Sequence, residues 1–414
     1  MSLLYNAGIY LFKAAVGIAS LRSAKIKEMR AGELLTLAQL SDCRRRVAPE
    51  GFDVWIHAAS LGEFEQGRPL IERIKRENPK ATILLTFFSP SGYRVRRDYK
   101  GVDAVYYLPL DTPGEVRRFL DAAAPHKIFF VKYEFWGNYL GELHRRGVPT
   151  YIISAIFRRR QRFFRFGGGV FRRMLRCFDR IYVQDENSRL LLESIGITNV
   201  TVAGDTRFDR VTDIRRNLPT LPEAVKRFAA EGDFTLVAGS TWPPDEALIF
   251  PWMKRHEGAR LIIAPHEFDD RRIADIIAAL GCNAVRLSDI TAGRPLPADC
   301  RAIVVDCFGL LSALYSTGSA AYVGGGFGVG IHNINEAAVY GIPVAFGPNH
   351  SKFKEASDLI AAGGGFEIAD SAAFEATMTR MLSDNAARAA AGKSAGDYIA
   401  SHIGATDIIY NDIF

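Results

Sequence analysis

One segment near the start of the chain, IHAASLGEF, places an acidic side chain directly after a turn. An apolar strand is predicted to end at Ala59, residues 60–62 turn the chain, and Glu63 lies near the start of the following helix. A carboxylate at the carboxyl end of a buried strand is well placed to act as a general base. A helix-start glutamate stabilised by the helix dipole would give the same pattern, so the segment alone leaves both interpretations open.

A second segment, YVGGGFGVGIHNINEAAVYGIPVAFGP, runs from a predicted strand into a glycine-rich loop and a helix that opens around residues 332–336. Glycine lets a backbone approach an anion, and the free N–H groups of a helix start can hold a phosphate. Glu336, one turn inside, is placed to bind ribose hydroxyls, as an acid does in dinucleotide-binding folds. The segment lacks the GK[ST] of a Walker A loop, and a tight turn in a sheet protein is the alternative.

A third segment, VVDCFGLLSALYSTGSAAYVGGG, ends an apolar strand at Asp306 and turns through Phe308, Gly309 and Leu310. The backbone of this turn and its aromatic ring are suited to holding a nucleotide base. Taken alone, the residues favour an ordinary turn between a strand and a helix.

Strands and helices must position these residues, and the sequence predicts a regular alternation of the two. A hydrophobic share of 48% in 414 residues supports large packed cores. Short β-rich runs alternate with amphipathic helical stretches, which indicates βαβ units and parallel sheets. The predicted strands are 53–60, 81–88, 104–110, 127–134, 149–154, 180–185 and 200–205, and then 235–240, 259–267, 283–287, 302–306, 320–326, 342–348 and 365–369.

The alternation breaks at the polar, proline-containing residues 215–222 and then restarts. We therefore predict an α/β protein with two Rossmann-like, doubly wound domains facing a central cleft, with ligands at the carboxyl ends of the strands. The predicted parts are an apolar anchor segment (1–30), an N-terminal domain (31–215), a C-terminal domain (222–390) and a C-terminal helical segment (391–414).

Positive charge is concentrated in one stretch, residues 143–178, which holds ten arginines and no acid. The whole chain has a net charge of +6, so the remainder is net acidic. Arginine pairs bidentately with phosphate, and the interleaved phenylalanines can enter lipid or stack on a base. A nucleic acid would use the same residues, but the apolar N-terminus favours an anionic membrane or a phosphorylated lipid.

The N-terminus, MSLLYNAGIYLFKAAVGIASL, is mostly apolar over about the length of a membrane span, although Asn6 and Lys13 interrupt it. It lacks the leading charge and the cleavage site of a secretory signal. We predict a membrane anchor that spans or lies in the interface. If it spans, the basic residues that follow the apolar run place the body on the cytoplasmic side. An amphipathic helix packed on the protein is the alternative.

The five cysteines form no CxxC pair, which favours a reducing compartment and argues against a disulfide framework or a zinc site. No Asp-rich metal motif is visible either. We therefore expect no metal requirement.

Eight motifs together resemble the Kdo (3-deoxy-D-manno-octulosonic acid) transferases of lipid A and lipopolysaccharide assembly. From about Trp55 to Pro348 they follow the order and spacing of that family: HAASLGE, VKYEFW, AGDTRFD, AGST, APHE, VDCFGLLSALY, GGGFGVGIHNINEA and YGIPVAFGP. The resemblance implies an inverting, metal-independent GT-B glycosyltransferase on the cytoplasmic face of the inner membrane. It implies CMP-Kdo as donor, a lipid A precursor as acceptor bound by the N-terminal domain, CMP bound by the C-terminal domain, and no cofactor.

The resemblance also assigns site residues. The family's catalytic base corresponds to Glu63, and its two supports for transition-state charge correspond to Lys132 and Arg207. We assign the acceptor and the membrane surface to four residues of the arginine-rich stretch, Arg158, Arg159, Arg160 and Arg162. The implied CMP contacts are Pro265, His266, Phe308, Gly309, Leu310, Asn333, Ile334, Asn335 and Glu336.

Four positions depart from the commoner family pattern. His266 stands where arginine is usual and is a weaker phosphate ligand near neutral pH. Lys132 stands where an acid is usual, which leaves its detailed role open, and Gly137 replaces a proline. Arg207 replaces a lysine, which keeps the charge and changes its geometry.

The implied reaction has Glu63 deprotonate an acceptor hydroxyl that attacks the anomeric carbon as CMP leaves. Three alternatives remain at this stage. They are a GT-B transferase for another nucleotide sugar such as a UDP-sugar, a nucleic-acid-binding protein built on residues 143–178, and a sugar-nucleotide epimerase with the same two domains. Nucleotide preference, salt-sensitive nucleic-acid binding and turnover without acceptor distinguish them.

Overall fold

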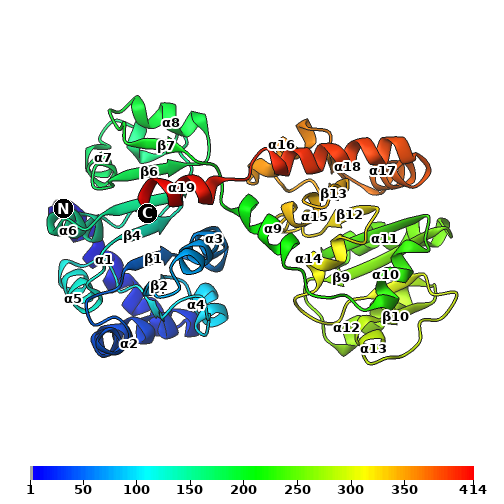
Figure 1. Cartoon of the computed structure of the whole chain (residues 1–414), viewed down its shortest axis with the longest axis horizontal. Coiled ribbons are helices and arrows are strands. Elements are labelled where there is room, and N and C mark those ends of the chain that lie inside the picture. Colours follow the sequence, from blue (N-terminus) through cyan, green and yellow to red (C-terminus); the bar gives the residue numbers. More distant parts are fainter. Residues whose placement is uncertain (1–2) are drawn as a thin grey trace. The chain divides into compact units, whose positions relative to one another are not determined.

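The computed structural model describes residues 3–414, which divide into two compact units. Unit 1 comprises the chain up to Arg210 together with Ile403–Phe414, and unit 2 comprises Val211–His402. Within the described residues each unit contains one seven-stranded parallel sheet with helices on both faces (Figure 1). The prediction of two Rossmann-like, doubly wound domains is confirmed, and every predicted strand is present.

Unit 1 has the spatial strand order β3-β2-β1-β4-β5-β6-β7. Its strands are β1 (Val54–Ala58), β2 (Ile83–Phe87), β3 (Ala104–Tyr107), β4 (Ile128–Val131), β5 (Thr150–Ala155), β6 (Arg180–Val183) and β7 (Val200–Val202). Its helices are α1 (Leu3–Ser20), α2 (Ala24–Val47), α3 (Leu61–Glu77), α4 (Pro90–Arg96), α5 (Pro113–Ala123), α6 (Gly137–Arg146), the 3₁₀ turn η1 (Arg162–Phe164), α7 (Gly169–Leu175), α8 (Glu186–Glu193), the first part of α9 (Arg207–Arg216) and α19 (Ala405–Ile413).

Unit 2 has the spatial strand order β10-β11-β9-β8-β12-β13-β14. Its strands are β8 (Phe234–Thr241), β9 (Ala259–Pro265), β10 (Ala284–Arg286), β11 (Ala302–Val304), β12 (Ala320–Val323), β13 (Val344–Phe346) and β14 (Gly365–Glu367). Its helices are α10 (Glu223–Ala230), α11 (Pro243–Arg255), α12 (Asp270–Leu280), α13 (Leu287–Thr291), α14 (Leu311–Tyr315), α15 (Asn335–Ala338), α16 (Lys354–Ala361), α17 (Ser371–Ser383) and α18 (Asn385–Ala400).

In each sheet the chain passes from one side of the first strand to the other, which makes the end of that strand a switch point. In unit 1 the chain adds β2 and β3 on one side of β1 and then returns to add β4 on the other side. In unit 2 the strands β9, β10 and β11 lie on one side of β8, and β12 lies on the other side. Ligands of doubly wound sheets bind at this switch point, outside the carboxyl ends of the strands. We therefore expect functional residues in the loops after β1, β4, β8 and β12.

The strands at the switch point of unit 1 are buried on both faces, as parallel strands between helices must be. On one face Trp55 packs against Phe119, Phe130 and Tyr139, with ring centroids 4.9–5.8 Å apart. Each fully buried side chain of this size contributes about 1.5–3 kcal/mol through removal of apolar surface from water. This packing makes the end of β1 a rigid support.

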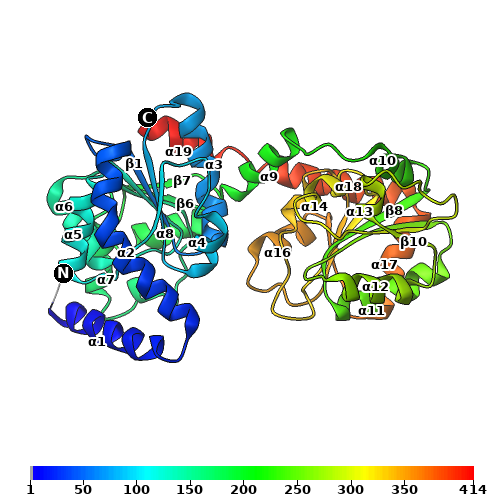
Figure 2. The same ribbon diagram turned by 90° about the horizontal axis from the view of Figure 1, so that it is seen from below.

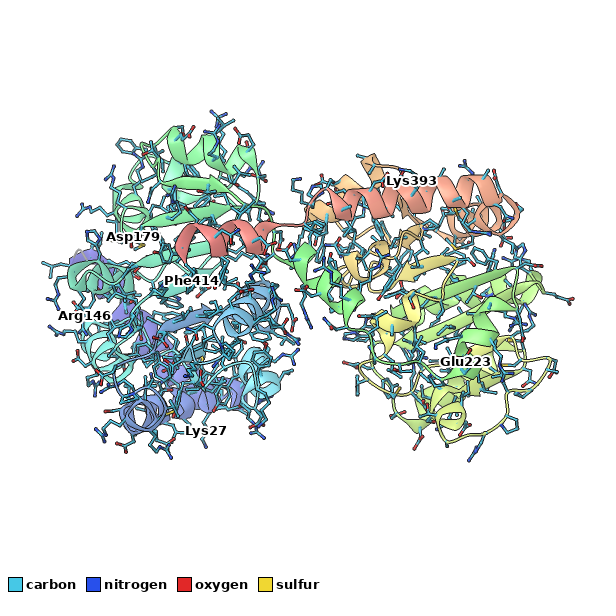
Figure 3. The ribbon with its side chains drawn as sticks, in the orientation of Figure 1. Lys27, Arg146, Asp179, Glu223, Lys393 and Phe414 are labelled. Atoms are coloured by element: carbon cyan, nitrogen blue, oxygen red, sulfur yellow. The ribbon has the colours of Figure 1, made fainter. Side chains whose placement is uncertain are left out.

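The last helix belongs to unit 1, whereas the sequence predicts a separate C-terminal helical segment over 391–414. The carboxylate of Asp209 accepts hydrogen bonds from the backbone N–H groups of Gly404 and Thr406, at 2.6 and 2.7 Å. Phe414, labelled in Figure 3, stacks on Phe129 at 6.2 Å. The division between units also falls after Arg210, not within 215–222, and α9 runs through it.

The apolar N-terminal segment forms α1, which lies beside the long α2 at the margin of unit 1 (Figure 2). Residues 1 and 2 of the predicted anchor lie outside the described residues. By length and composition α1 is able to cross a membrane, and it is the one such helix among the described residues.

The polar residues that interrupt α1 face the body of unit 1. The Tyr5 hydroxyl donates to Asp111 Oδ2 at 2.6 Å, and the Asn138 side chain donates to Asn6 Oδ1 at 2.9 Å. Lys13 forms an ion pair with Glu115 at 2.9 Å. The helix therefore docks through its polar face and leaves an apolar face outward, which includes Leu3, Leu4, Leu11, Phe12 and Ile18.

Candidate active site

Glu63 is fixed by the start of α3. The helix begins at Leu61 with Ser60 as its N-cap, so the predicted turn is shorter than expected. Glu63 Oε2 accepts from the Ser60 backbone N–H at 2.9 Å and from its hydroxyl at 3.1 Å. Within residues 3–414, Oε1 accepts no hydrogen bond. Helix capping and proton transfer are therefore compatible, because one oxygen orients the side chain and leaves the other to take a proton.

The electrostatics of the site favour a stronger base at Glu63. Burial raises the pKa of this carboxyl above its usual range, and the negative charge of Glu134 raises it further. The hydrogen bonds from Ser60 and the charge of His57 oppose this effect without cancelling it. A raised pKa is typical of carboxylates that act as general bases near neutral pH.

Lys132, directly after β4, adopts the left-handed backbone conformation with φ of +68°. Its backbone N–H donates to Ile153 O at 2.9 Å. This conformation is rare for a residue with a Cβ and is concentrated at functional sites. The Lys132 ammonium lies 5.5 Å from the centre of the Tyr133 ring.

The pKa of the Tyr133 hydroxyl is shifted by several charged groups around it. Burial raises the pKa of its hydroxyl, and the positive charges of Arg158 and Arg207 act in the opposite direction. Glu63 adds a raising effect. Three residues predicted from separate motifs are therefore within electrostatic reach of one tyrosine in unit 1.

Arg207, at the start of α9, is tied to a buried carboxylate. Its Nε and Nη2 donate to Asp205 Oδ2 at 2.9 and 2.7 Å. Asp205 Oδ1 also accepts from Gln66, which lies one helical turn beyond Glu63 on α3. The guanidinium is thus fixed relative to the helix that carries the candidate base.

Sequence reasoning missed His57 and Glu134 as parts of this site. His57 is on β1 and Glu134 follows β4, and their side chains meet at 3.0 Å. Both residues lie inside motifs that the resemblance used, HAASLGE and VKYEFW. Their position at the carboxyl ends of predicted strands was the available signal.

In unit 2, three aromatic rings stack above the switch point. Trp242 follows β8, His266 follows β9, and His332 lies in the loop after β12. The His266 ring lies 4.8 Å from Trp242 and 4.3 Å from His332, nearly parallel to both. Burial and the neighbouring His266 lower the pKa of His332, and the charge of Asp245 acts in the opposite direction. Trp242 was not predicted as a site residue.

A cavity of about 410 Å³ lies beside these rings, within the usual size range of ligand sites. Its lining includes Thr241, Trp242, Phe268 and Arg272. Phe308 is 83% exposed, and its ring lies 4.8 Å from that of Phe268. Phe268 is partly buried against the core, so it supports an exposed ring that is suited to contact with a nucleotide base.

Glu336 connects two of the predicted nucleotide segments. Its Oε2 accepts from the Ser312 hydroxyl at 2.8 Å, and its Oε1 accepts from Asn333 Nδ2 at 3.0 Å. The side chains of Ile334 and Asn335 are buried, whereas Asn333 is exposed and Glu336 partly exposed. Neither polar atom of the Asn335 side chain has a partner in the described part of the chain.

The glycine-rich loop after β12 has positions that only glycine fits. Gly325 has φ of +93°, and a Cβ at Gly326 would lie 2.6 Å from the Gly347 backbone. Asp245, which is buried, accepts from the Gly325 N–H at 3.0 Å and from the Tyr322 hydroxyl at 2.8 Å. The loop is therefore held close to the sheet. The helix that follows begins at Asn335, within the predicted range of 332–336, and is one turn long.

In the arginine-rich stretch (143–178) the arginines of the central part are exposed, whereas most phenylalanines are buried or partly buried. Arg158, Arg159, Arg160 and Arg162 are exposed and form no ion pair within residues 3–414, whereas Arg146 pairs with Glu142 (Arg146 is labelled in Figure 3). The expectation that the phenylalanines reach lipid is wrong for most of them. Phe163 packs on Phe157 and Phe135, because a protein core is available on that side. Phe166 is fully exposed.

Among residues 3–414 no group of three or more His, Cys, Asp or Glu side chains is arranged to hold a metal ion.

Comparison with known proteins identifies the family of this chain. The family model described as 3-deoxy-D-manno-octulosonic-acid transferase (kdotransferase) matches residues 25–210. A 3-deoxy-D-manno-octulosonic acid transferase of Bordetella pertussis is 30% identical over 87% of this chain and 87% of its own length. The enzyme of the same name from Aquifex aeolicus is 27% identical over 80% of this chain and 86% of its own.

Solved structures show the same fold at low identity. A UDP-GlcNAc 2-epimerase from Neisseria meningitidis bound to UDP-GlcNAc has a TM-score of 0.60, with 15% identity over 86% of this chain and 98% of its own. MurG from Acinetobacter baumannii has a TM-score of 0.54, with 12% identity over 86% of this chain and 99% of its own.

Proposed function

The chain belongs to the family of 3-deoxy-D-manno-octulosonic acid (Kdo) transferases, and on this premise we propose that it transfers Kdo from CMP-Kdo to a lipid A precursor. The observation that carries the proposal is the arrangement of Glu63. Its carboxylate is partly buried, Oε2 accepts hydrogen bonds from Ser60, and Oε1 is positioned to accept a proton. Arg207 and Lys132 supply positive charge in the same neighbourhood. Transfer to a hydroxyl requires a base that removes its proton, and an acidic sugar requires positive charge beside its carboxylate.

In the proposed reaction Glu63 Oε1 takes the proton of an acceptor hydroxyl, whose oxygen forms a bond to the anomeric carbon of Kdo. The bond from that carbon to the phosphate oxygen of CMP breaks, and its electron pair leaves with CMP. One displacement inverts the anomeric configuration. Positive charge develops on the sugar ring, as in other glycosyl transfers. Lys132 and Arg207 are suited to bind the sugar carboxylate.

We assign the CMP moiety to unit 2. The cavity beside Trp242 and the exposed Phe308 suit the base, and Glu336 suits the ribose hydroxyls. The glycine-rich loop offers backbone N–H groups to the phosphate.

The decisive experiment is transfer of labelled Kdo from CMP-Kdo to a purified lipid A precursor by the purified protein. Labelled lipid that depends on the donor supports the proposal. Calorimetric titration with CMP and with UDP, run in parallel, tests the donor class. Tighter binding of UDP, or no labelled lipid from CMP-Kdo, would refute the proposed reaction.

We further propose that the protein associates with the cytoplasmic face of the inner membrane through α1, lying in the interface. A spanning helix would expose Asn6 and Lys13 to hydrocarbon, which is costly. Here both residues are bonded to unit 1, and the apolar face points outward. The exposed arginines add attraction to anionic headgroups, worth about 1 kcal/mol each close to the surface.

Replacing Leu4, Leu11 and Ile18 by serine is expected to reduce recovery on anionic vesicles by at least about a hundredfold. Each buried side chain of this size contributes about 1.5–3 kcal/mol to partitioning. Vesicle flotation at high salt measures the effect without the contribution of the arginines. The thermal midpoint should stay unchanged because these residues face away from unit 1. Full flotation of the folded variant would contradict the role of α1.

Changing Arg158, Arg159, Arg160 and Arg162 to glutamine is expected to raise KM for the lipid acceptor by about tenfold or more and to leave CMP affinity unchanged. These side chains have no ion pair to lose within the described residues, so stability should not fall. The control removes four exposed arginines elsewhere: Arg76, Arg97, Arg271 and Arg294. Equal loss in both variants would show a nonspecific charge effect, and altered CMP affinity would reverse the assignment.

A further inference from the structure

The start of α6 is capped by side chains from outside the helix. The first N–H groups of a helix have no carbonyl partner within it, and the N-cap residue of α6 supplies no side-chain cap. Asp111 Oδ2 accepts from the Asn138 N–H at 3.0 Å, and Asp111 Oδ1 accepts from the Tyr139 N–H at 2.9 Å. The N–H of Gly137, which is also buried, donates to the hydroxyl of Tyr5 at 2.9 Å.

Tyr5 joins this cap to α1. Its hydroxyl accepts from Gly137 and donates to Asp111 Oδ2 at 2.6 Å, so one oxygen uses both hydrogen-bonding functions of a phenol. Tyr5 therefore also orients the carboxylate that caps the next two positions of α6. Asn6, beside it on α1, accepts from the Asn138 side chain at 2.9 Å. Asp111 is 1% exposed and Asn138 is 8% exposed, so these contacts are shielded from water.

Position 137 fits this arrangement because it is a glycine. A Cβ there would lie 2.9 Å from the Tyr5 ring and 2.8 Å from Met174 Cε. A proline, the residue of the commoner family pattern at this position, would also have no N–H to donate to the hydroxyl. Gly137 and Tyr5 therefore form a matched pair in this chain.

The cap lies at one end of the loop that carries Lys132. Residues 132–136 connect β4 to α6. At the β4 end the Lys132 N–H donates to Ile153 O at 2.9 Å, and Lys132 has the left-handed φ of +68°. Such a conformation persists only where the surroundings hold it. Because the sheet holds one end of this short loop, a fixed start of α6 at the other end helps to retain the conformation of Lys132.

We propose that Tyr5 is a positioning residue for Kdo transfer: from α1 it holds the start of α6, and thereby the loop 132–136 with Lys132. The proposal rests on the proposed function, since it needs Lys132 to act on the sugar. Tyr5 itself need not contact substrate. The helix assigned to the membrane surface thus also supports the active site, and its docking on unit 1 is needed for full turnover even where no membrane is present.

The test is Kdo transfer by the Tyr5→Phe variant with the acceptor in detergent micelles, where attachment to a membrane is not required. Phenylalanine keeps the ring against Gly137 and removes both hydrogen bonds. We expect kcat to fall by about tenfold, less than the roughly hundredfold cost of misplacing a group by about 1 Å. KM for the acceptor and the Kd of CMP should stay unchanged. The control is Tyr10→Phe on the same helix, whose side chain is 53% exposed and whose hydroxyl should not affect kcat.

A second measurement does not depend on turnover. The chain has four tryptophans, and labelling with 5-fluorotryptophan gives each a fluorine NMR resonance. Trp136, the last residue of the loop, is assigned with the Trp136→Phe variant. Tyr5→Phe should shift or broaden this resonance, and Tyr10→Phe should not. The resonances of Trp242 and Trp252, which lie in unit 2, serve as internal references. A general loss of stability would not select one resonance.

Wild-type kcat in Tyr5→Phe, or equal losses in Tyr5→Phe and Tyr10→Phe, would overturn the proposal. A loss on vesicles but not in micelles would overturn it as well, because Tyr5 would then act only in membrane attachment. Absence of Kdo transfer by the wild type would refute the proposed function instead. In that case the Trp136 resonance decides alone: a shift in Tyr5→Phe supports the positioning of the loop, and an unchanged resonance overturns it.

Discussion

Kdo transfer by Glu63→Gln is expected to fall by about 10²–10⁴, the usual contribution of a general base. Glutamine retains the size of the side chain and an oxygen that can accept from the Ser60 backbone, so the start of α3 should persist. It loses the basic carboxylate. Donor affinity should stay near normal, because the proposed nucleotide contacts are in unit 2. Initial rates and the thermal midpoint, measured on one preparation, provide the test.

The alternative role of Glu63, a helix-start acid only, makes a different prediction. It allows a loss of a few tenths of a kcal/mol in stability and near-normal turnover. The matched control is Glu65→Gln, which removes a carboxylate on the same helix. Turnover of Glu63→Gln close to that of this control would sink the catalytic assignment.

The pH profile of the wild-type protein gives an independent check on Glu63. Its pKa is raised by burial and by Glu134, so it holds its proton to a higher pH than an exposed glutamate. The base is available above this pKa and lost as pH falls through it. We therefore expect the acid limb of kcat/KM above the usual range of a glutamate.

CMP binding by Glu336→Ala is expected to weaken by about 5- to 150-fold, equivalent to about 1–3 kcal/mol for hydrogen bonds to a charged group. The carboxylate is oriented by hydrogen bonds from Ser312 and Asn333, which place it between the two predicted nucleotide segments. Calorimetric titration with CMP measures the change.

The control for Glu336 is Ser312→Ala, which removes the internal hydrogen bond and keeps the carboxylate. A much smaller loss in Ser312→Ala would show that the acid itself contacts the nucleotide. Equal losses would indicate that Glu336 acts by joining the two loops. Wild-type affinity in folded Glu336→Ala would exclude the residue from the nucleotide site.

The sequence by itself determined the fold class and the family, and it supplied most of the candidate site residues. Alternation of buried strands and amphipathic helices is a local property, so β1 and β8 could be located from residues 53–60 and 235–240 alone. The ends of these strands then placed Glu63 and the loop before Glu336. The order of the motifs carried the family, which the comparison with known proteins confirmed.

Local patterns failed where an element's environment decided the outcome. Phe163 and Arg162 are neighbours in the sequence, yet one is buried and the other exposed, because only one side of the segment faces a core. In the sequence, Asn6 and Lys13 interrupt an apolar helix without an evident reason. In the structure, Asn138 donates a hydrogen bond to Asn6, and Glu115 forms an ion pair with Lys13.

The electrostatics of the candidate base were decided by tertiary structure. His57 and Glu134 are 77 positions apart, and no spacing rule connects them. They meet because β1 and β4 are neighbours in the sheet although β2 and β3 come between them in the chain. Strand order depends on how the whole sheet packs, whereas hydrophobic periodicity depends only on each element. The sequence therefore located a carboxylate, and only the folded sheet supplied the burial and the second charge that raise the pKa of Glu63.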